Sequence, residues 1–136
     1  MTLLLALWLA FGDIGAVKAE PDLDKRSELA LLNADHDLDA ARQAYSGGDL
    51  KAAQDAISEL TESIDVCYDA LQHGRTPPRK SKYYKRAELK VDALIRRLNG
   101  FRDDVSYDAR PFVESALKKV SAVHDQLIAD IMSKKK

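Results

Sequence analysis

The chain of 136 residues contains one cysteine and one tryptophan, and its longest apolar run covers only residues 3–12. A single cysteine, Cys67, allows no disulfide within the chain, so packing must stabilise the fold. The apolar run is about half of the roughly 20 residues that a transmembrane helix needs. These shortages exclude a disulfide-stabilised scaffold and argue against a membrane-spanning segment.

Motifs for common catalytic and cofactor sites are also missing. The chain has no glycine-rich phosphate loop, no CxxC pair and no HExxH sequence. It has no CxxCH haem attachment site and none of the Glu-x-x-His pairs that build a di-iron site inside a helical bundle. We therefore expect a non-enzymatic protein with no catalytic residues and no bound cofactor.

The amino-terminal segment differs from the rest of the chain. Residues 3–12, LLLALWLAFG, are apolar, and small residues follow up to Val17-Lys18-Ala19. An apolar core followed by small residues at alternate positions is typical of a secretory signal peptide. We therefore expect residues 1–19 to be a signal peptide that is cleaved after Ala19, which makes the protein periplasmic or secreted. No lysine or arginine precedes the apolar run, and the alternative is a buried hydrophobic helix.

Residues 20–136 are predicted to form one helical domain. Apolar residues recur there at alternating steps of three and four, the spacing of an amphipathic helix. The four apolar stripes are Leu31-Ala34-Leu38-Ala41-Tyr45, Leu50-Ala53-Ile57-Leu60-Ile64-Cys67-Leu71, Tyr84-Ala87-Val91-Leu94-Leu98-Phe101-Val105 and Val113-Leu117-Val120-His124-Leu127-Ile131. With the turn residues between them, they predict helices at about 22–46, 49–73, 82–104 and 108–132. The third stripe continues through Asn99 and Gly100, so we expect one continuous helix there.

The connections between the predicted helices determine their arrangement. They are about three, eight and four residues long, which makes sequential helices antiparallel. The prediction is therefore an all-α, up-down-up-down four-helix bundle made of two helical hairpins, with neighbouring helices crossing at about 20°. A longer and flatter pair of hairpins is the alternative.

The turn between the first two predicted helices resembles a known family. A tetratricopeptide repeat has a turn region that is similar to Ala41, Tyr45, Gly48-Asp49-Leu50 and Ala53 of this chain. The resemblance covers about 35 residues, and no second copy follows at the period of that repeat. It implies a single helical hairpin with a protein-binding surface, and it assigns no binding residues.

The formal net charge of −1 hides a division between the two predicted hairpins. Residues 20–73 contain 13 acidic and 4 basic side chains, whereas residues 74–136 contain 8 acidic and 16 basic side chains. One interpretation is complementarity, in which the hairpins dock through exposed ion pairs that contribute less than about 1 kcal/mol each. The other interpretation assigns part of the basic charge to a binding partner.

The densest basic segment connects the second and third predicted helices. It reads HGRTPPRKSKYYKRAELK, and its candidate anion-binding residues are Arg75, Arg79, Lys80, Lys82, Tyr83, Tyr84, Lys85 and Arg86. Cations interleaved with aromatic residues fit phosphates or an anionic membrane surface. Lys118, Lys119 and the tail at residues 134–136 extend the basic charge. Nucleic acid would use the same chemistry, but the expected export argues against that partner.

A second candidate site pairs Cys67 with His124. Both residues occupy stripe positions with apolar neighbours, on helices that run parallel in the predicted bundle. Thiolate and imidazole bind soft metals, and together they form an activated nucleophile. The alternative is structural, because a buried cysteine packs as a small apolar side chain. The acidic run nearer the amino terminus is predicted to be a solvated helix face, on which only Asp35 and Asp39 point the same way.

These patterns leave three hypotheses about function. The first is a non-enzymatic exported protein that acts through protein–protein contacts on its helix faces. The second is a binder of polyanions or of an anionic envelope surface, through the basic residues 75–90. The third is a small metal or thiol site at Cys67 and His124. Apolar residues outside the stripes, such as Ile95, Val123 and Ile128, also leave room for a homo-oligomer.

Overall fold

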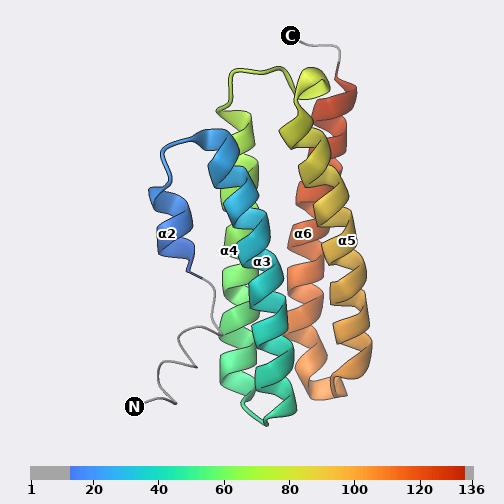
Figure 1. The fold of residues 1–136 in the computed structure, drawn as a ribbon. Helices are drawn as coiled ribbons and strands as arrows, with labels where there is room; N and C mark the ends of the chain where they lie inside the picture. The colour runs from blue at the N-terminus through green and yellow to red at the C-terminus, as the bar shows by residue number, and fades with distance from the viewer. Residues whose placement is uncertain (1–12, 134–136) are drawn as a thin grey trace.

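A computed structural model describes residues 13–133, and helices make up most of this part of the chain (Figure 1). The prediction of an all-helical protein is confirmed for these residues, which contain no strand. Five described α-helices pack together: α2 (Ile14–Ala19), α3 (Leu23–Ser46), α4 (Leu50–Gln72), α5 (Lys82–Asp104) and α6 (Arg110–Met132). Two short 3-10 helices, η1 (Pro78–Lys80) and η2 (Tyr107–Ala109), precede α5 and α6. The apolar run at residues 3–12 and the lysines of the tail lie outside the described residues.

The bounds of the four long helices differ from those predicted by at most two residues. Side-chain oxygens of Asp22, Asp49 and Ser81 accept hydrogen bonds from backbone N–H groups in the first turns of α3, α4 and α5. Gly48 has a φ of 83°, which glycine adopts without strain, and it turns the chain from α3 into α4. The start of α6 has no side-chain cap and carries Pro111 in its first turn.

Helix α5 continues without a break through Asn99 and Gly100, as its apolar stripe predicts. Phe101, the next residue, is 1% exposed, so core packing holds this last part of the helix. A side chain at position 100 would meet the guanidinium of Arg42, which donates a hydrogen bond to the backbone carbonyl of Arg97 (3.3 Å). Arg42 therefore connects α3 to the backbone of α5 beside this glycine.

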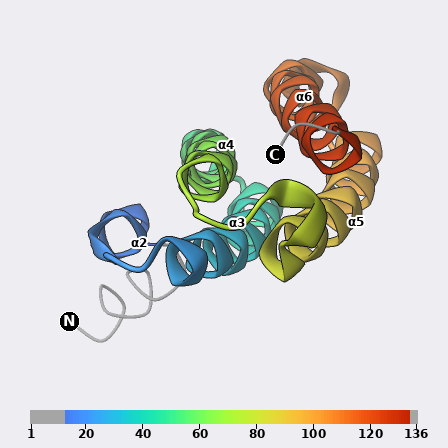
Figure 2. The same cartoon turned by 90° about the horizontal axis from the view of Figure 1, so that it is seen from above.

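The four long helices form two hairpins that lie side by side (Figure 1, Figure 2). Helix α3 packs against α4 and α5, and helix α6 packs against α5 and α4. Most stripe residues lie in the shared core, whose largest fully buried apolar side chains include Phe101, Leu38, Leu60, Ile64, Leu98 and Leu127. Leu50, the first residue of α4, is an exception and is exposed. Each large buried side chain stabilises the fold by about 1.5–3 kcal/mol, which supplies the stability that no disulfide can provide.

The short helix α2 falls within the predicted signal peptide. It packs on α3 and α4, and its Val17 is 5% exposed. The backbone N–H of Asp13 donates a hydrogen bond to the side-chain oxygen of Asn33 (2.7 Å), and Lys18 forms an ion pair with Glu62. Residues 13–19 therefore have defined packing contacts in the full chain. None of the described helices combines the length and hydropathy that a membrane span requires.

Candidate functional site

The predicted basic segment lies at one end of the molecule, where α4 ends and α5 begins (Figure 1). All seven of its cationic side chains are exposed, and the first five of them are Arg75, Arg79, Lys80, Lys82 and Lys85. None of these five forms an ion pair with an acidic side chain of residues 13–133. We refer to these five residues as the basic end.

The local sequence places positive charge at the start of a helix. The hydroxyl of Ser81 caps α5 by accepting a hydrogen bond from the N–H of Tyr84 (3.2 Å). The first turn of α5 contains no acidic residue, although the positive amino-terminal end of a helix favours acids. Lys82 and Lys85 therefore add charge to an end that is already positive. This arrangement repels cations and attracts an anion.

The other three predicted anion-binding residues have contacts within the protein. Tyr83 is half-buried, and its ring centroid lies 5.2 Å from Nζ of Lys82 and 5.8 Å from Cζ of Arg86. Arg86 also forms an ion pair with Glu28 of α3. Tyr84 is buried, and its hydroxyl contacts α6 rather than solvent. The structure therefore keeps the basic end accessible and assigns Tyr84 and Arg86 to structural contacts.

Asp130 of α6 joins three helices next to the basic end. Its carboxylate accepts hydrogen bonds from the hydroxyls of Tyr68 of α4 (2.7 Å) and Tyr84 of α5 (3.2 Å). Burial and the bond to Asp130 raise the pKa of Tyr68 to about 12. Burial and the same carboxylate raise the pKa of Tyr84 above its usual range. Both phenols remain protonated donors at neutral pH, and they hold the last turns of α6 against the segment that carries the cations.

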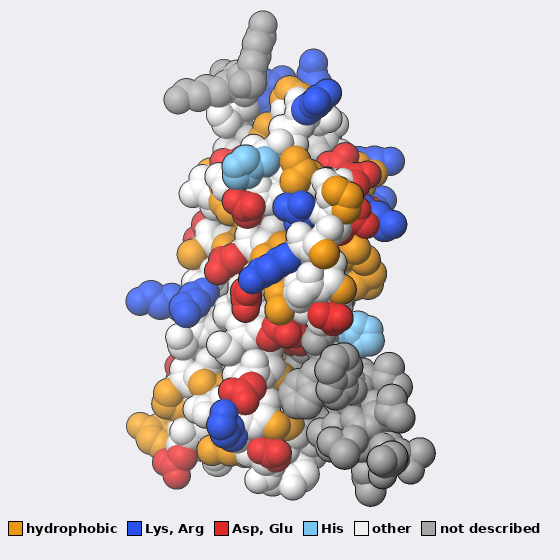
Figure 3. Space-filling model, turned by 90° about the vertical axis from the view of Figure 1, so that its left-hand side faces the viewer, with side chains coloured by type: hydrophobic (Ala, Val, Ile, Leu, Met, Phe, Trp, Pro, Cys, Tyr) orange, Lys and Arg blue, Asp and Glu red, His pale blue; other side chains and the backbone are white. Residues whose placement is uncertain are grey.

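The division of charge predicted from the sequence appears as ion pairs between α3 and α5. Arg97 of α5 lies 3.0 Å from Asp35 and 2.5 Å from Asp39, which face the same way as predicted. Arg42 of α3 pairs with Asp104 of α5 (3.1 Å). Other acidic side chains are spread along the face on the α2 side (Figure 3). Part of the charge division therefore serves hairpin docking, whereas the basic end has no such role.

Cys67 and His124 have different environments. Cys67 is buried, and burial raises the pKa of its thiol to about 12, which disfavours the thiolate that binds metals. His124 is half-buried, and its Nε2 lies 2.8 Å from a carboxylate oxygen of Glu88 of α5. Within the described part of the chain, no three histidine, cysteine, aspartate or glutamate side chains are grouped to hold a metal ion. These contacts favour structural roles for both residues.

The chain matches no family model, no curated protein and no solved structure. The function is therefore inferred from the charges, contacts and exposed side chains of the chain itself.

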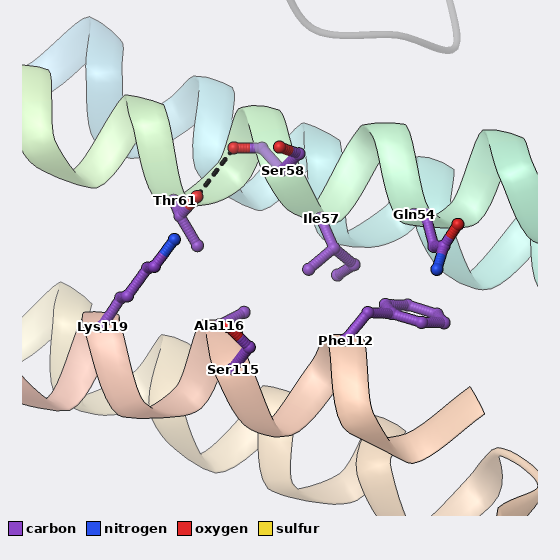
Figure 4. Close-up of a pocket in the computed structure, with 8 residues that line it drawn as sticks. All are labelled: Gln54, Ile57, Ser58, Thr61, Phe112, Ser115, Ala116 and Lys119. Carbon is purple, nitrogen blue, oxygen red and sulfur yellow. Dashed lines mark hydrogen bonds between the residues drawn. The ribbon is translucent and has the colours of Figure 1, made fainter. Parts of the chain in front are cut away.

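A groove of about 190 Å³ lies between α4 and α6 (Figure 4). Ile57, Ala116 and Phe112 line its apolar part, and Lys119 extends from α6 toward Thr61 of α4 (Figure 4). The Thr61 hydroxyl already donates a hydrogen bond within its own helix. Ligand pockets usually enclose about 300–1,000 Å³. The groove is therefore better described as the crevice between two packed helices than as a ligand site.

An exposed apolar pair lies at the same end of the molecule as the basic segment, which the sequence alone does not show. Ile128 and Met132 of α6 are 42% and 75% exposed. They are four residues apart, so they share one face of the helix. The sequence signal for this pair is two apolar residues, four positions apart, that do not belong to the buried stripe of the same helix. The sequence alone shows that Ile128 is such a residue, but not which charges lie beside it.

Proposed function

We propose that this chain is a non-enzymatic helical protein that binds an anionic surface through the basic end. The observation that carries the proposal is a set of five exposed cations without acidic partners among residues 13–133. Two of the arginines farther along α5, Arg86 and Arg97, are ion-paired with α3. Repulsion among the unpaired cations destabilises the free protein, and a bound anion relieves that repulsion.

The side chains of the basic end suit phosphate-bearing partners. Arg75 and Arg79 present planar guanidinium groups, which hold a phosphate through two parallel hydrogen bonds. The lysines act as mobile point charges that adapt to irregularly spaced anions. The chemistry that fits is a surface with many phosphates rather than one small anion, because the cations lie along an exposed loop and helix start.

The proposal is tested by the quadruple variant Arg79→Gln, Lys80→Gln, Lys82→Gln and Lys85→Gln. Each cation near an anionic surface contributes about 1 kcal/mol, so we expect binding to weaken about a thousandfold. Binding of the wild-type protein should also fall steeply with added salt, because each neutralised phosphate releases counterions. Fluorescence anisotropy with labelled polyphosphate and co-sedimentation with phosphatidylglycerol vesicles measure both effects.

A matched control removes the same charge elsewhere. Lys51, Arg96, Arg102 and Lys118 lie outside the basic end, and their replacement by glutamine should leave most of the binding intact. Equal losses in the two quadruple variants would show a nonspecific effect of net charge. That result, or a wild-type protein that binds neither probe, would contradict the proposal.

Export and removal of residues 1–19 are part of the same proposal. The mature protein would then consist of α3 to α6, arranged as a four-helix bundle of two hairpins, and the basic end would meet an anionic surface in the cell envelope. Amino-terminal sequencing of the protein from envelope fractions of its own cells should find Glu20 as the first residue. If the protein is cytosolic and retains Met1, the proposed export is wrong, but the proposed binding through the basic end is not affected.

Protein–protein contact is the second candidate function, favoured by the outer face of α3 and α5. Leu32 of α3 and Leu89 of α5 are 56% and 66% exposed. A cavity of about 290 Å³ between the two helices is lined by Leu31, Leu32, Glu28, Asp35, Arg86 and Lys90. An apolar side chain flanked by charges would fit this cavity. The apolar part of such a contact depends weakly on salt, which distinguishes it from binding through the basic end.

A further inference from the structure

The outer face of the α5–α6 hairpin carries exposed apolar side chains next to the basic end. We propose that this face binds a bilayer of anionic lipids, with Ile128 and Met132 entering the headgroup boundary while Lys82 and Lys85 contact lipid phosphates. The inference rests on the proposed function, and it adds the type of anionic surface and the orientation of the protein on it.

Two contacts fix the register of α6 along α5. Nε2 of His124 lies 2.8 Å from Glu88, and the carboxylate of Asp130 lies 3.2 Å from the hydroxyl of Tyr84. The two helices run in opposite directions (Figure 1). Residues nearer the carboxyl end of α6 therefore lie beside residues nearer the amino end of α5.

This register places the apolar pair beside the cations. Ile128 lies between the two contacts in α6, and Lys85 lies between them in α5, so these residues are at the same level. Met132, in the last turn of α6, is level with the start of α5 at Lys82. The exposed apolar residues of α6 and the first two lysines of α5 are therefore exposed at the same levels of the hairpin.

The apolar pair faces solvent rather than the core. Asp130, which lies between Ile128 and Met132 in sequence, contacts tyrosines of α4 and α5, and Leu127 is completely buried. Successive residues of a helix point about 100° apart, so the pair lies on the opposite side of α6 from Asp130. Their exposed fractions of 42% and 75% agree with this placement.

A bilayer explains the surface better than a soluble polyanion does. Interfacial binding combines cations that attract anionic headgroups with apolar side chains that enter the acyl boundary. A soluble polyanion would gain nothing from Ile128 or Met132. The neighbouring acids, Glu88 and Asp125, lie toward the middle of the hairpin. Glu88 contacts Nε2 of His124, and Asp125 precedes Ile128 by about one helical turn. The acids therefore border the proposed contact rather than occupy it.

The test compares two probes with a variant that removes only the apolar contribution. Ile128→Ser combined with Met132→Ser should weaken binding to vesicles of phosphatidylcholine and phosphatidylglycerol about tenfold, because apolar burial is lost. Binding to labelled polyphosphate should be unchanged. The control variant Leu50→Ser with Tyr107→Ser removes apolar side chains that are 45% and 83% exposed at the opposite end. It should bind both probes as the wild-type protein does.

A second measurement does not depend on the stability of the serine variant. The Cys67 thiol is buried and protonated, so a Met132→Cys variant can be labelled at position 132 with an environment-sensitive fluorophore. We expect a blue shift of its emission on phosphatidylglycerol vesicles and no shift on vesicles of phosphatidylcholine alone. No shift on either vesicle would overturn the inference.

The outcomes separate this inference from the proposed function. If the serine variant binds vesicles as tightly as the wild-type protein while the quadruple glutamine variant does not, the lipid inference is wrong and the proposed function stands. Binding of the wild-type protein to polyphosphate but not to vesicles also overturns the lipid inference, and it identifies a soluble polyanion as the partner. If the wild-type protein binds neither probe, both proposals fail.

Discussion

Phe101→Ala is expected to lower the free energy of unfolding by about 3–5 kcal/mol, the cost of removing a large aromatic side chain from a core. Phe101 is 1% exposed and packs edge-to-face against Tyr45 of α3, with ring centroids 6.0 Å apart. The guanidinium carbon of Arg42 lies 5.2 Å from the Phe101 centroid. The substitution therefore leaves a cavity and also removes two aromatic contacts that join the hairpins.

Chemical denaturation followed by far-ultraviolet circular dichroism measures this loss, provided that the slope of the transition is unchanged. Tyr107→Ala supplies a matched control, because Tyr107 is an aromatic residue that is 83% exposed. Its substitution should change the free energy of unfolding by no more than about 0.5 kcal/mol. If the two variants lose similar stability, Phe101 is not a central residue of the core.

Phe101 also illustrates how much of the fold can be predicted from the sequence. It continues the stripe of Leu94 and Leu98 beyond Gly100, and this periodicity is enough to extend α5 past a glycine. Periodicity identifies the buried face of a helix, but not the residue that meets it from another helix. The contact between Phe101 and Tyr45 follows from tertiary packing, which a single sequence pattern does not encode.

The same limit applies to the candidate site. The sequence shows a dense basic segment, but it does not distinguish Lys82, which is exposed, from Arg86, which is ion-paired with Glu28. That distinction depends on which acids of α3 lie beside α5. The apolar pattern likewise shows that Met132 is outside the stripe without showing that it is level with the start of α5.

In helix α2, a sequence pattern typical of a signal peptide coincides with residues that pack against the rest of the protein. Small residues before Ala19 fit a signal-peptide cleavage region, which makes packing there the less favoured of the two interpretations of the sequence. In the full chain, Val17 is nonetheless buried against α3 and α4. A helix of this length is not stable alone, so its conformation depends on the surface that it covers.

Asn33 lies on that surface, and Asn33→Ala is expected to lower the free energy of unfolding by about 3 kcal/mol. Its amide nitrogen lies 2.8 Å from the hydroxyl of Ser63, 3.3 Å from Asp37 and 3.2 Å from Glu59. Ser63 and Asp37 are completely buried. Alanine would leave these polar groups with one donor fewer where water cannot replace it.

The control for this prediction is another asparagine in a helix. Asn99 is half-buried, and its amide donates one hydrogen bond to a backbone carbonyl of its own helix. Asn99→Ala should therefore cost less than about 1 kcal/mol, because one ordinary hydrogen bond is lost. Equal losses at positions 33 and 99 would contradict a special role for the buried polar cluster.

A double-mutant cycle identifies the origin of the loss at Asn33. If the cost comes from the buried carboxylate, adding Asp37→Asn to Asn33→Ala removes the charge that has lost this donor. The double variant should then be less destabilised than the sum of the two single variants. Strict additivity in chemical denaturation would show that Asn33 acts through its volume or through the bond from Asp13, and not through Asp37. The cycle thus tests whether Asn33 stabilises the packing of α3 on α4 through its contact with Asp37 or through its volume and its other hydrogen bonds.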